Sequence, residues 1–186
     1  EEKRKIDNYD KVKNNPIFKK GDTINYSVKS FVKNQDQVIA DIIKRLPGIE
    51  ITEGGVIKYQ GKQINKYYIE GMNLLDDKYA LANNNIPAIS VDQIQILENH
   101  QPIKALDSFT ISNQAGINIK LNNNAKNKII GRSKIGVGGV PFMYENELVP
   151  MQFGSSHQTI VSYKNNNTGL NNEKELDLLN SNNFIN

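Results

Sequence analysis

The sequence has 186 residues, with 23 Lys and Arg against 20 Asp and Glu and a formal net charge of +3. A chain of this length forms one ordinary domain, or one domain with an appendage, and its interspersed charges lack the basic stripe that nucleic-acid binding requires. It contains no Cys, which excludes disulfides, thiolate metal sites and a Cys nucleophile, and no apolar run reaches the roughly 20 residues of a membrane helix.

The first predicted elements are an arm, a strand and a helix. Residues 1–20 are polar and predict a linker or extended arm, and the β-forming residues of Asp22–Val28 predict a strand. A helix is expected over Gln35–Leu46, with Asn34 as its cap and Pro47 at its end, because proline disfavours helix at the residue before it. The apolar positions that give this segment a 3.6-residue period are Val38, Ile39, Ile42, Ile43 and Leu46.

The next part of the chain predicts short strands and one short helix. Ile49–Thr52 indicates a strand, and in the hairpin that follows Gly61 and Lys62 turn the chain between Val56–Gln60 and Ile64–Glu70. A short helix is expected over Lys78–Ala82, ahead of the Asn83–Asn85 run. The two remaining segments are strands with alternating apolar residues, Val91–Leu97 and Gly116–Leu121.

The pattern changes near residue 122. Three longer strands are expected over Asn127–Val140, Tyr144–Phe153 and Gln158–Lys164, and a short helix over Glu173–Leu179. Three such strands leave open edges, so we expect them to pair with strands outside this sequence. The sequence therefore predicts an α+β fold in three parts: a linker (1–20), a small mixed domain (21–121) and the start of a larger β-structure (122–186).

The order of these elements resembles the plug domain of TonB-dependent outer-membrane receptors. The resemblance rests on an ordered set of segments and not on any single motif. Five segments carry it within the first two parts of the chain: GDTINYSVKSF (Gly21–Phe31), DIIKRLPGIEI (Asp41–Ile51), GVIKYQGKQINKYYIEG (Gly55–Gly71), IPAISVDQIQILENHQPIKAL (Ile86–Leu106) and AGINIKL (Ala115–Leu121). QTIVSYKNNNTG (Gln158–Gly169) looks like an early barrel strand and outer loop of the Bacteroidetes-type branch.

The resemblance implies a non-catalytic plug that closes the lumen of a transmembrane barrel in the cell outer membrane. It implies four partners: the chain's own barrel, the membrane around it, a TonB-type energising protein that acts on the upstream segment, and an unidentified nutrient. No cofactor is implied. The sequence has no recognisable energy-coupling box and no preceding carboxypeptidase-like domain, and a barrel of about 22 strands does not fit its length, so we expect a fragment of a receptor.

Substrate contacts are expected from the loops at the outer end of such a plug. The candidates are Asp76, Asp77, Lys78, Tyr79, Asn83, Asn84 and Asn85. Tyr79 offers a ring to stack on a ligand, and the Asp and Asn side chains offer hydrogen bonds. The competing interpretation is ordinary loop chemistry, with Asp76 or Asp77 capping the following helix.

Catalytic and metal sites are not expected. His100 and His157 are far apart, and Glu98 shares a strand face with His100 merely because the side-chain period of a strand is two. Ser155 and Ser156 beside His157 form a turn and lack a third group to orient a base. The glycines at 136, 138 and 139 lack the Lys-Ser/Thr and helix of a phosphate loop.

A second hypothesis is a free-standing periplasmic or cell-surface α+β module that binds a ligand such as a glycan. It accounts for the polar composition but not for the change near residue 122. An enzyme is a third hypothesis, and no constellation of residues supports it. Many further alternating segments of about ten residues beyond Asn186 would favour the receptor.

Overall fold

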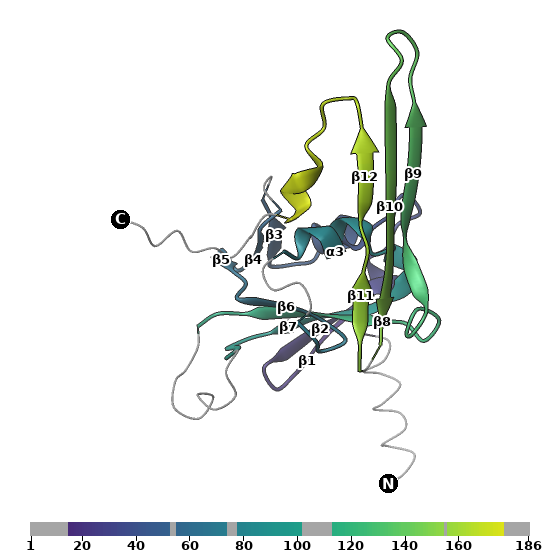
Figure 1. Ribbon diagram of the computed structural model, residues 1–186. Coiled ribbons are helices and arrows are strands. Elements are labelled where there is room, and N and C mark those ends of the chain that lie inside the picture. The colour runs from purple at the N-terminus through teal and green to yellow at the C-terminus, as the bar shows by residue number, and fades with distance from the viewer. Residues whose placement is uncertain (1–14, 53–54, 74–77, 102–112, 155, 177–186) are drawn as a thin grey trace.

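The computed structural model describes residues 15–52, 55–73, 78–101, 113–154 and 156–176. Within these ranges the protein is a mixed α+β structure with two short α-helices and three sheets that do not close into a barrel, which confirms the predicted fold class (Figure 1). None of the described helices is both long and apolar enough to cross a membrane.

A five-stranded sheet forms the base of the molecule. Its strands are, in spatial order, β1 (Ile17–Lys20), β2 (Thr23–Ser27), β7 (Val91–Leu97), β8 (Gly116–Leu121) and β6 (Lys66–Ile69). Neighbours are antiparallel except β6 and β8, which are parallel. The expectation of an arm through residue 20 is wrong for Ile17–Lys20, because these residues pair with β2 as the edge strand β1.

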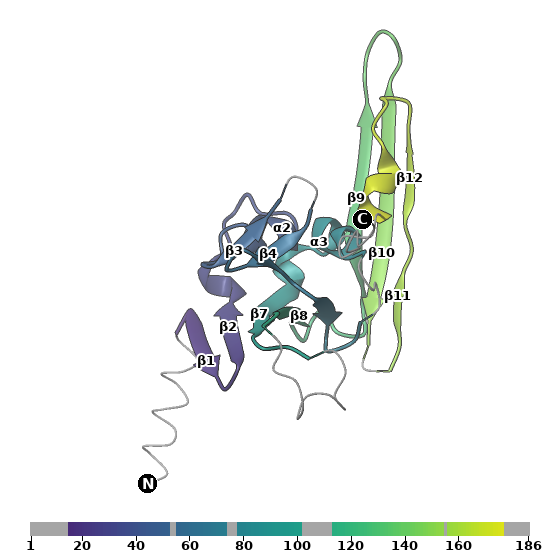
Figure 2. The ribbon, with the colours of Figure 1, turned by 90° about the vertical axis from the view of Figure 1, so that its left-hand side faces the viewer.

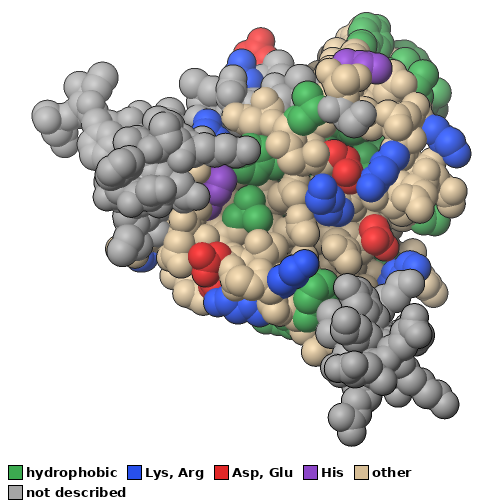
Figure 3. Space-filling view, turned by 90° about the horizontal axis from the view of Figure 1, so that it is seen from below, with side chains coloured by type: hydrophobic (Ala, Val, Ile, Leu, Met, Phe, Trp, Pro, Cys, Tyr) green, Lys and Arg blue, Asp and Glu red, His purple; other side chains and the backbone are tan. Residues whose placement is uncertain are grey.

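The two faces of this sheet differ in polarity. On one face Tyr26, Ile94 and Ile119 lie on neighbouring strands and are buried in the core. On the other face the amides of Asn25, Gln95 and Asn118 are aligned across β2, β7 and β8. The molecule seen from this side is largely polar, with acidic and basic side chains interspersed (Figure 3).

Two helices and a small sheet cover the apolar face. The covering elements are η1 (Val28–Ser30), α2 (Ile39–Ile43), β3 (Ile49–Ile51), β4 (Ile57–Tyr59), β5 (Lys62–Gln63), α3 (Ala80–Asn85) and η2 (Ala88–Ser90). Their apolar side chains enter one hydrophobic cluster with the sheet. The helix expected over Lys78–Ala82 is therefore present but lies two to three residues later.

Helix α2 is shorter than predicted, and Asn34 does not cap it. Its N-cap is Val38, and the Asp41 carboxylate accepts hydrogen bonds from the backbone N–H groups of Gln37 and Val38 at 3.1 and 3.2 Å. The residues before it form a turn in which the Asp36 carboxylate pairs with Arg45 and accepts the Lys33 N–H. This local turn replaces the first helical turn that propensity favoured.

The predicted hairpin is confirmed, but its second strand is divided between two sheets. Gln60 and Gly61 have φ values of 49° and 78°, which form the tight turn between β4 and β5. The chain then leaves the small sheet, and β6 pairs with β8 in the five-stranded sheet. The hairpin thus links the two sheets through one continuous segment.

The C-terminal part is an antiparallel meander beside the α/β part. It contains β9 (Ile129–Val137), β10 (Tyr144–Phe153), β11 (Gln158–Ile160) and β12 (Tyr163–Asn166), followed by η4 (Asn172–Leu176). The strand β10 pairs with β9 on one side and with β11 and then β12 on the other. Figures 1 and 2 show the β9–β10 hairpin extending beyond the helices.

Pro150 explains why the third predicted strand is interrupted. It lies in the middle of β10, and its carbonyl accepts a hydrogen bond from the Val161 N–H at 3.0 Å. Proline has no N–H to return to the neighbouring strand, so the ladder is broken at this point. The chain accordingly forms β11 up to Ile160 and resumes as β12 at Tyr163.

Candidate functional site

The helix α3 carries most of the predicted contact residues, and its buried side fixes their positions. Tyr79, Ala82 and Ile86 recur at helical spacing and are buried. The ring of Tyr79 stacks on Tyr67 with centroids 5.3 Å apart, and its hydroxyl accepts the Ile57 N–H at 3.1 Å. Both the ring and the hydroxyl of Tyr79 are therefore used inside the core.

The other predicted residues divide between the core, the surface and the undescribed part of the chain. Asn83 is buried and accepts a 2.8 Å hydrogen bond from the Tyr67 hydroxyl, whose pKa is raised by burial and by the neighbouring Tyr79. Lys78 is exposed, and Asp76 and Asp77 lie outside the described residues. Asn84 and Asn85 remain, at the C-terminal end of α3.

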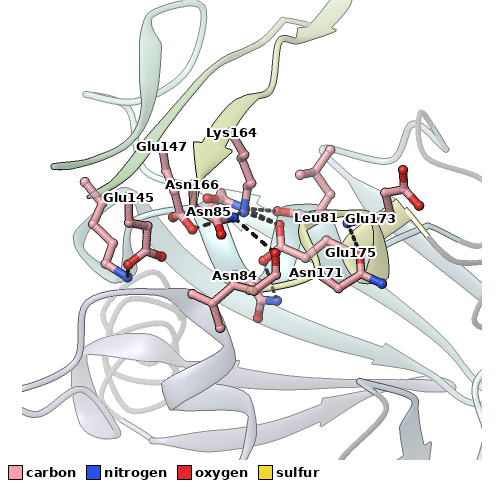
Figure 4. A network of polar contacts seen from close by, with 12 residues as sticks. Leu81, Asn84, Asn85, Glu145, Glu147, Lys164, Asn166, Asn171, Glu173 and Glu175 are labelled. Atoms are coloured by element: carbon pink, nitrogen blue, oxygen red, sulfur yellow. Dashed lines mark hydrogen bonds and ion pairs between the residues drawn. The ribbon is translucent and has the colours of Figure 1, made fainter. Parts of the chain in front are cut away.

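Asn84 and Asn85 bind a carboxylate from the far end of the chain. The amide of Asn84 donates to Glu175 Oε1 at 3.0 Å, and that of Asn85 donates to Glu175 Oε2 at 3.2 Å and to the Leu81 carbonyl at 2.9 Å. Glu175 belongs to η4, which places it against α3 although about 90 residues separate them in sequence. Figure 4 shows these groups converging.

Lys164 of β12 completes this arrangement. Its ammonium group donates to Glu175 Oε2 at 2.7 Å and lies 3.7 Å from Glu147 Oε1 on β10. The side chain of Lys164 is 9 % exposed, so its charge is compensated within the protein. We refer to Asn84, Asn85, Glu147, Lys164 and Glu175 as the polar network.

A hollow of about 350 Å³ lies beside α3. It is lined by Ala40, Lys44, Ile51, Thr52, Gly55, Ala80, Asn83 and Asn84. Asn84 therefore belongs both to the hollow and to the polar network. The ammonium, hydroxyl and amide groups of this lining can form hydrogen bonds with a polar ligand.

Sequence reasoning singled out Asn84 and Asn85 as substrate contacts, and it did not anticipate the charged residues that join them in the polar network. Glu147 and Lys164 lie opposite each other on β10 and β12, where the strand period turns both side chains toward α3. The alternation of Glu145 and Glu147 along a predicted strand was the available signal. Nothing local to Glu175 indicated that it would reach α3.

The meander presents a different surface on its other face. Ile135 is 79 % exposed and Tyr163 is 56 % exposed, and both point away from the core with Val137 and Leu148. The inward face is apolar near the base, where Val149, Met151 and Phe153 are buried, and charged farther along, where Lys134 lies 2.6 Å from Glu145. The outer face thus carries exposed apolar side chains alongside polar ones such as Ser133 and Asn146, whereas the inner face is partly charged.

The Glu98 carboxylate connects three parts of the fold. It accepts hydrogen bonds from Lys19 on β1 at 2.5 Å and from the Tyr59 hydroxyl on β4 at 2.7 Å. The hydrogen bond from Lys19, followed by that from Tyr59, holds the pKa of Glu98 below its ordinary value. Burial, together with Glu98, raises the pKa of Tyr59.

The histidines do not form a metal or catalytic site with their neighbours in the described ranges. The ring of His100 lies 2.9 Å from the Tyr68 hydroxyl, whereas Glu98 is engaged with Lys19 and Tyr59. His157 Nδ1 lies 3.2 Å from Ser156 Oγ on an exposed turn, and Ser155 lies outside the described residues. No group of three His, Cys, Asp or Glu side chains in those ranges is placed to hold a metal ion.

The comparisons with known proteins gave structural similarities alone. No family model and no curated protein matches the chain. It is similar to the ferric-catecholate import receptor Fiu from E. coli K12 (14 % identity, TM-score 0.38, 77 % of this chain and 21 % of that chain). It is also similar to P. aeruginosa FpvA in complex with a heterologous pyoverdine (18 % identity, TM-score 0.40, 81 % of this chain and 20 % of that chain). A third similar structure is the alcaligin outer-membrane receptor FauA from Bordetella pertussis (14 % identity, TM-score 0.39, 82 % of this chain and 32 % of that chain). The chain thus spans between 20 % and 32 % of these receptors.

Proposed function

We propose that residues 21–121 are the plug of a TonB-dependent outer-membrane receptor of the Bacteroidetes type and that residues 122–186 supply its first barrel strands. The receptor takes up a nutrient across the outer membrane, and this part of it is a gate without catalytic activity. The proposed boundary coincides with the end of β8 at Leu121.

The two-faced meander is the observation that carries this proposal. A transmembrane barrel strand needs an apolar face toward lipid and a polar or packed face toward the lumen. The outward residues Ile135, Val137 and Leu148 are exposed and apolar, while Lys134 and Glu147 point inward. The strand β9 has 9 residues and β10 has 10, which suits a tilted membrane crossing of roughly 9–11 residues.

The inner face of the meander supports the gate function. Near the base, Phe153 and Met151 join the plug core, whereas farther along the contact with α3 consists of the polar network. A hydrogen bond contributes only about 0.5–1.5 kcal/mol net, because its groups bond to water once the surfaces have separated. An energising protein that pulls on the segment upstream of β1 can therefore separate the plug from the meander first at the polar network.

The ligand contacts that we propose center on the hollow beside α3. Asn84 lines it and Lys78 is exposed nearby in sequence, while Asp76 and Asp77 precede the helix. Asn83 and Asn85 are buried, unlike Asn84, and the ring of Tyr79 lies in the core. Asn84 and Lys44 are thus the first positions to substitute in an uptake assay.

Fractionation of the source cells tests the proposal. An antibody against this segment should detect a heat-modifiable outer-membrane band far larger than 21.0 kDa. In that fraction, Ile135→Cys should be shielded from a water-soluble maleimide while Lys134→Cys, one residue away on the opposite face, reacts. A soluble band near 21.0 kDa with equal labelling of both positions would instead support the free-standing binding module.

A further inference from the structure

In the last described segment of the chain, residues 167–176, the side chain of Glu175 contacts α3 through polar groups. Residues 167–171 and Glu173 are exposed, and Asn172 is half-buried. Among the described side chains of this segment, Glu175 makes the contacts with α3 and β12, with one carboxylate oxygen on Asn84 and the other shared by Asn85 and Lys164. The Glu175 carboxylate therefore connects the segment to α3 and β12, and Asn166 of β12 makes a second contact by donating to the Leu170 carbonyl at 3.1 Å.

The partners of the Glu175 carboxylate are largely buried, so they depend on its negative charge. Asn85 is 1 % exposed and the side chain of Lys164 is 9 % exposed, so neither can turn fully to water if the carboxylate leaves. Lys164 would retain Glu147 at 3.7 Å, a weaker partner than Glu175 at 2.7 Å. Partly buried pairs are also screened less by salt than exposed ones.

We propose that Glu175 is a latch that holds residues 167–176 closed over the C-terminal end of α3. When the latch opens, Asn84 and Asn85 lose their carboxylate acceptor, and the hollow that Asn84 lines gains a freed amide donor. The latch is a property of the fold, so it holds whether or not the chain belongs to a receptor.

Asn84 connects the latch to the hollow. Asn84 lines the hollow, and its side-chain amide donates to Glu175 Oε1 at 3.0 Å. The Nδ2 group carries two hydrogens, and a group in the hollow that accepts the one bonded to Glu175 competes with the carboxylate. For such a group, occupancy of the hollow and closure of the segment oppose each other. Linkage requires that closing the segment weakens binding of such a group by the same factor.

Spin-label distances in the full chain test the latch. The chain has no Cys, so Leu170→Cys and Lys44→Cys, both at exposed positions, take labels without background. We expect a single narrow distance distribution that broadens and lengthens with Glu175→Gln, because the amide loses the ion pair with Lys164 and offers one acceptor oxygen where the carboxylate offers two. The matched control is Glu173→Gln in the same short helix, where the side chain is exposed and the distribution should not change.

A second pair of labels separates opening of the latch from loss of the fold. Lys44→Cys and Lys62→Cys are both exposed and lie outside the latch, so their distance should stay the same in every variant. Lys164→Gln should broaden the Leu170–Lys44 distribution less than Glu175→Gln, since the two Asn donors remain. An unchanged Leu170–Lys44 distribution in Glu175→Gln would overturn the proposal, and so would broadening of both label pairs together.

Discussion

The hydroxyl groups of Tyr67 and Tyr79 point to different parts of the core although their rings are stacked at an interplanar angle of 9°. Tyr67 donates to Asn83 Oδ1 on α3, and Tyr79 accepts the backbone N–H of Ile57 on β4. The stacked pair thereby joins the five-stranded sheet, the small sheet and α3. It also fixes the face of α3 that Asn84 and Asn85 occupy.

We expect Tyr79→Phe to retain the stack but leave the buried Ile57 N–H without its acceptor. The free energy of unfolding should fall by about 1–3 kcal/mol, the usual penalty for an unsatisfied buried polar group. Urea denaturation followed by circular dichroism measures it. Tyr163→Phe, at an exposed position on β12, is the control and should change stability by less than about 0.5 kcal/mol. Equal effects of the two substitutions would show that the Tyr79 hydroxyl has no structural role.

Glu98 should make the stability depend on acid pH. Its pKa is below the ordinary value in the folded state, chiefly through the hydrogen bond from Lys19. The ionised carboxylate therefore stabilises the fold above its unfolded pKa of roughly 4.3, and this contribution is lost as the pH falls through the lower folded pKa.

Glu98→Gln tests this dependence through urea denaturation at a series of pH values. The variant should be less stable than the wild type at pH 7, and the difference should shrink as the pH falls below 4. Glu50→Gln, an exposed carboxylate on β3, is the matched control. If Glu98→Gln and the wild type lose stability in parallel across the acid range, the Lys19 and Tyr59 contacts do not perturb Glu98.

The sequence predicted what depends on local pattern and missed what depends on distant contacts. The alternating segments at β7 and β8 and the long strands of the meander lie close to their expected bounds, because one buried face imposes a period of two. The edge strand β1 was missed because its pairing with β2 is what orders its polar residues. The expectation of a ligand contact placed Tyr79 in an outer loop, whereas its spacing with Ala82 and Ile86 predicts the burial that the structure shows.

The candidate site shows the same limit. Asn84 and Asn85 stood out as a polar run, but their partner Glu175 lies about 90 residues away and has no distinguishing neighbours in sequence. The interruption of the last strand follows from Pro150 on the neighbouring strand and not from residues 161 and 162 themselves. Pairing register decides such features, and a single sequence does not specify it.

Gly131 should be required for the pairing of β9 with β10. Its φ is +153°, and an added Cβ would collide with the Val149 carbonyl on the paired strand. We expect Gly131→Ala to lower the free energy of unfolding by about 1–3 kcal/mol, the usual range for a strained backbone position. Gly139→Ala, where no atom lies within 4 Å of the added carbon, is the control and should be tolerated. Similar unfolding curves for both variants would mean that β9 shifts to accommodate a side chain.

Asn118 should stabilise the polar face of the five-stranded sheet through both ends of its amide. Its Nδ2 donates to Gln95 Oε1 at 2.8 Å, its Oδ1 accepts the Gly71 N–H at 3.0 Å, and Gln95 in turn donates to Asn25 at 2.8 Å. Asn118→Ala removes this amide at a buried position and leaves Gln95 Oε1 and the Gly71 N–H without it, so we expect a loss of about 1–3 kcal/mol in the free energy of unfolding.

A double-mutant cycle with Gln95→Ala tests whether the amides of Asn118 and Gln95 are coupled in their effect on the free energy of unfolding. If the amides are coupled, the double variant should lose less free energy of unfolding than the two single variants lose together, by roughly 0.5 kcal/mol or more. Asn123→Ala, at an exposed position just after β8, is the control for loss of an Asn side chain as such. Strict additivity of Asn118→Ala and Gln95→Ala would mean that each amide is satisfied independently. The register of β2, β7 and β8 would then rest on the apolar pairs of the opposite face alone.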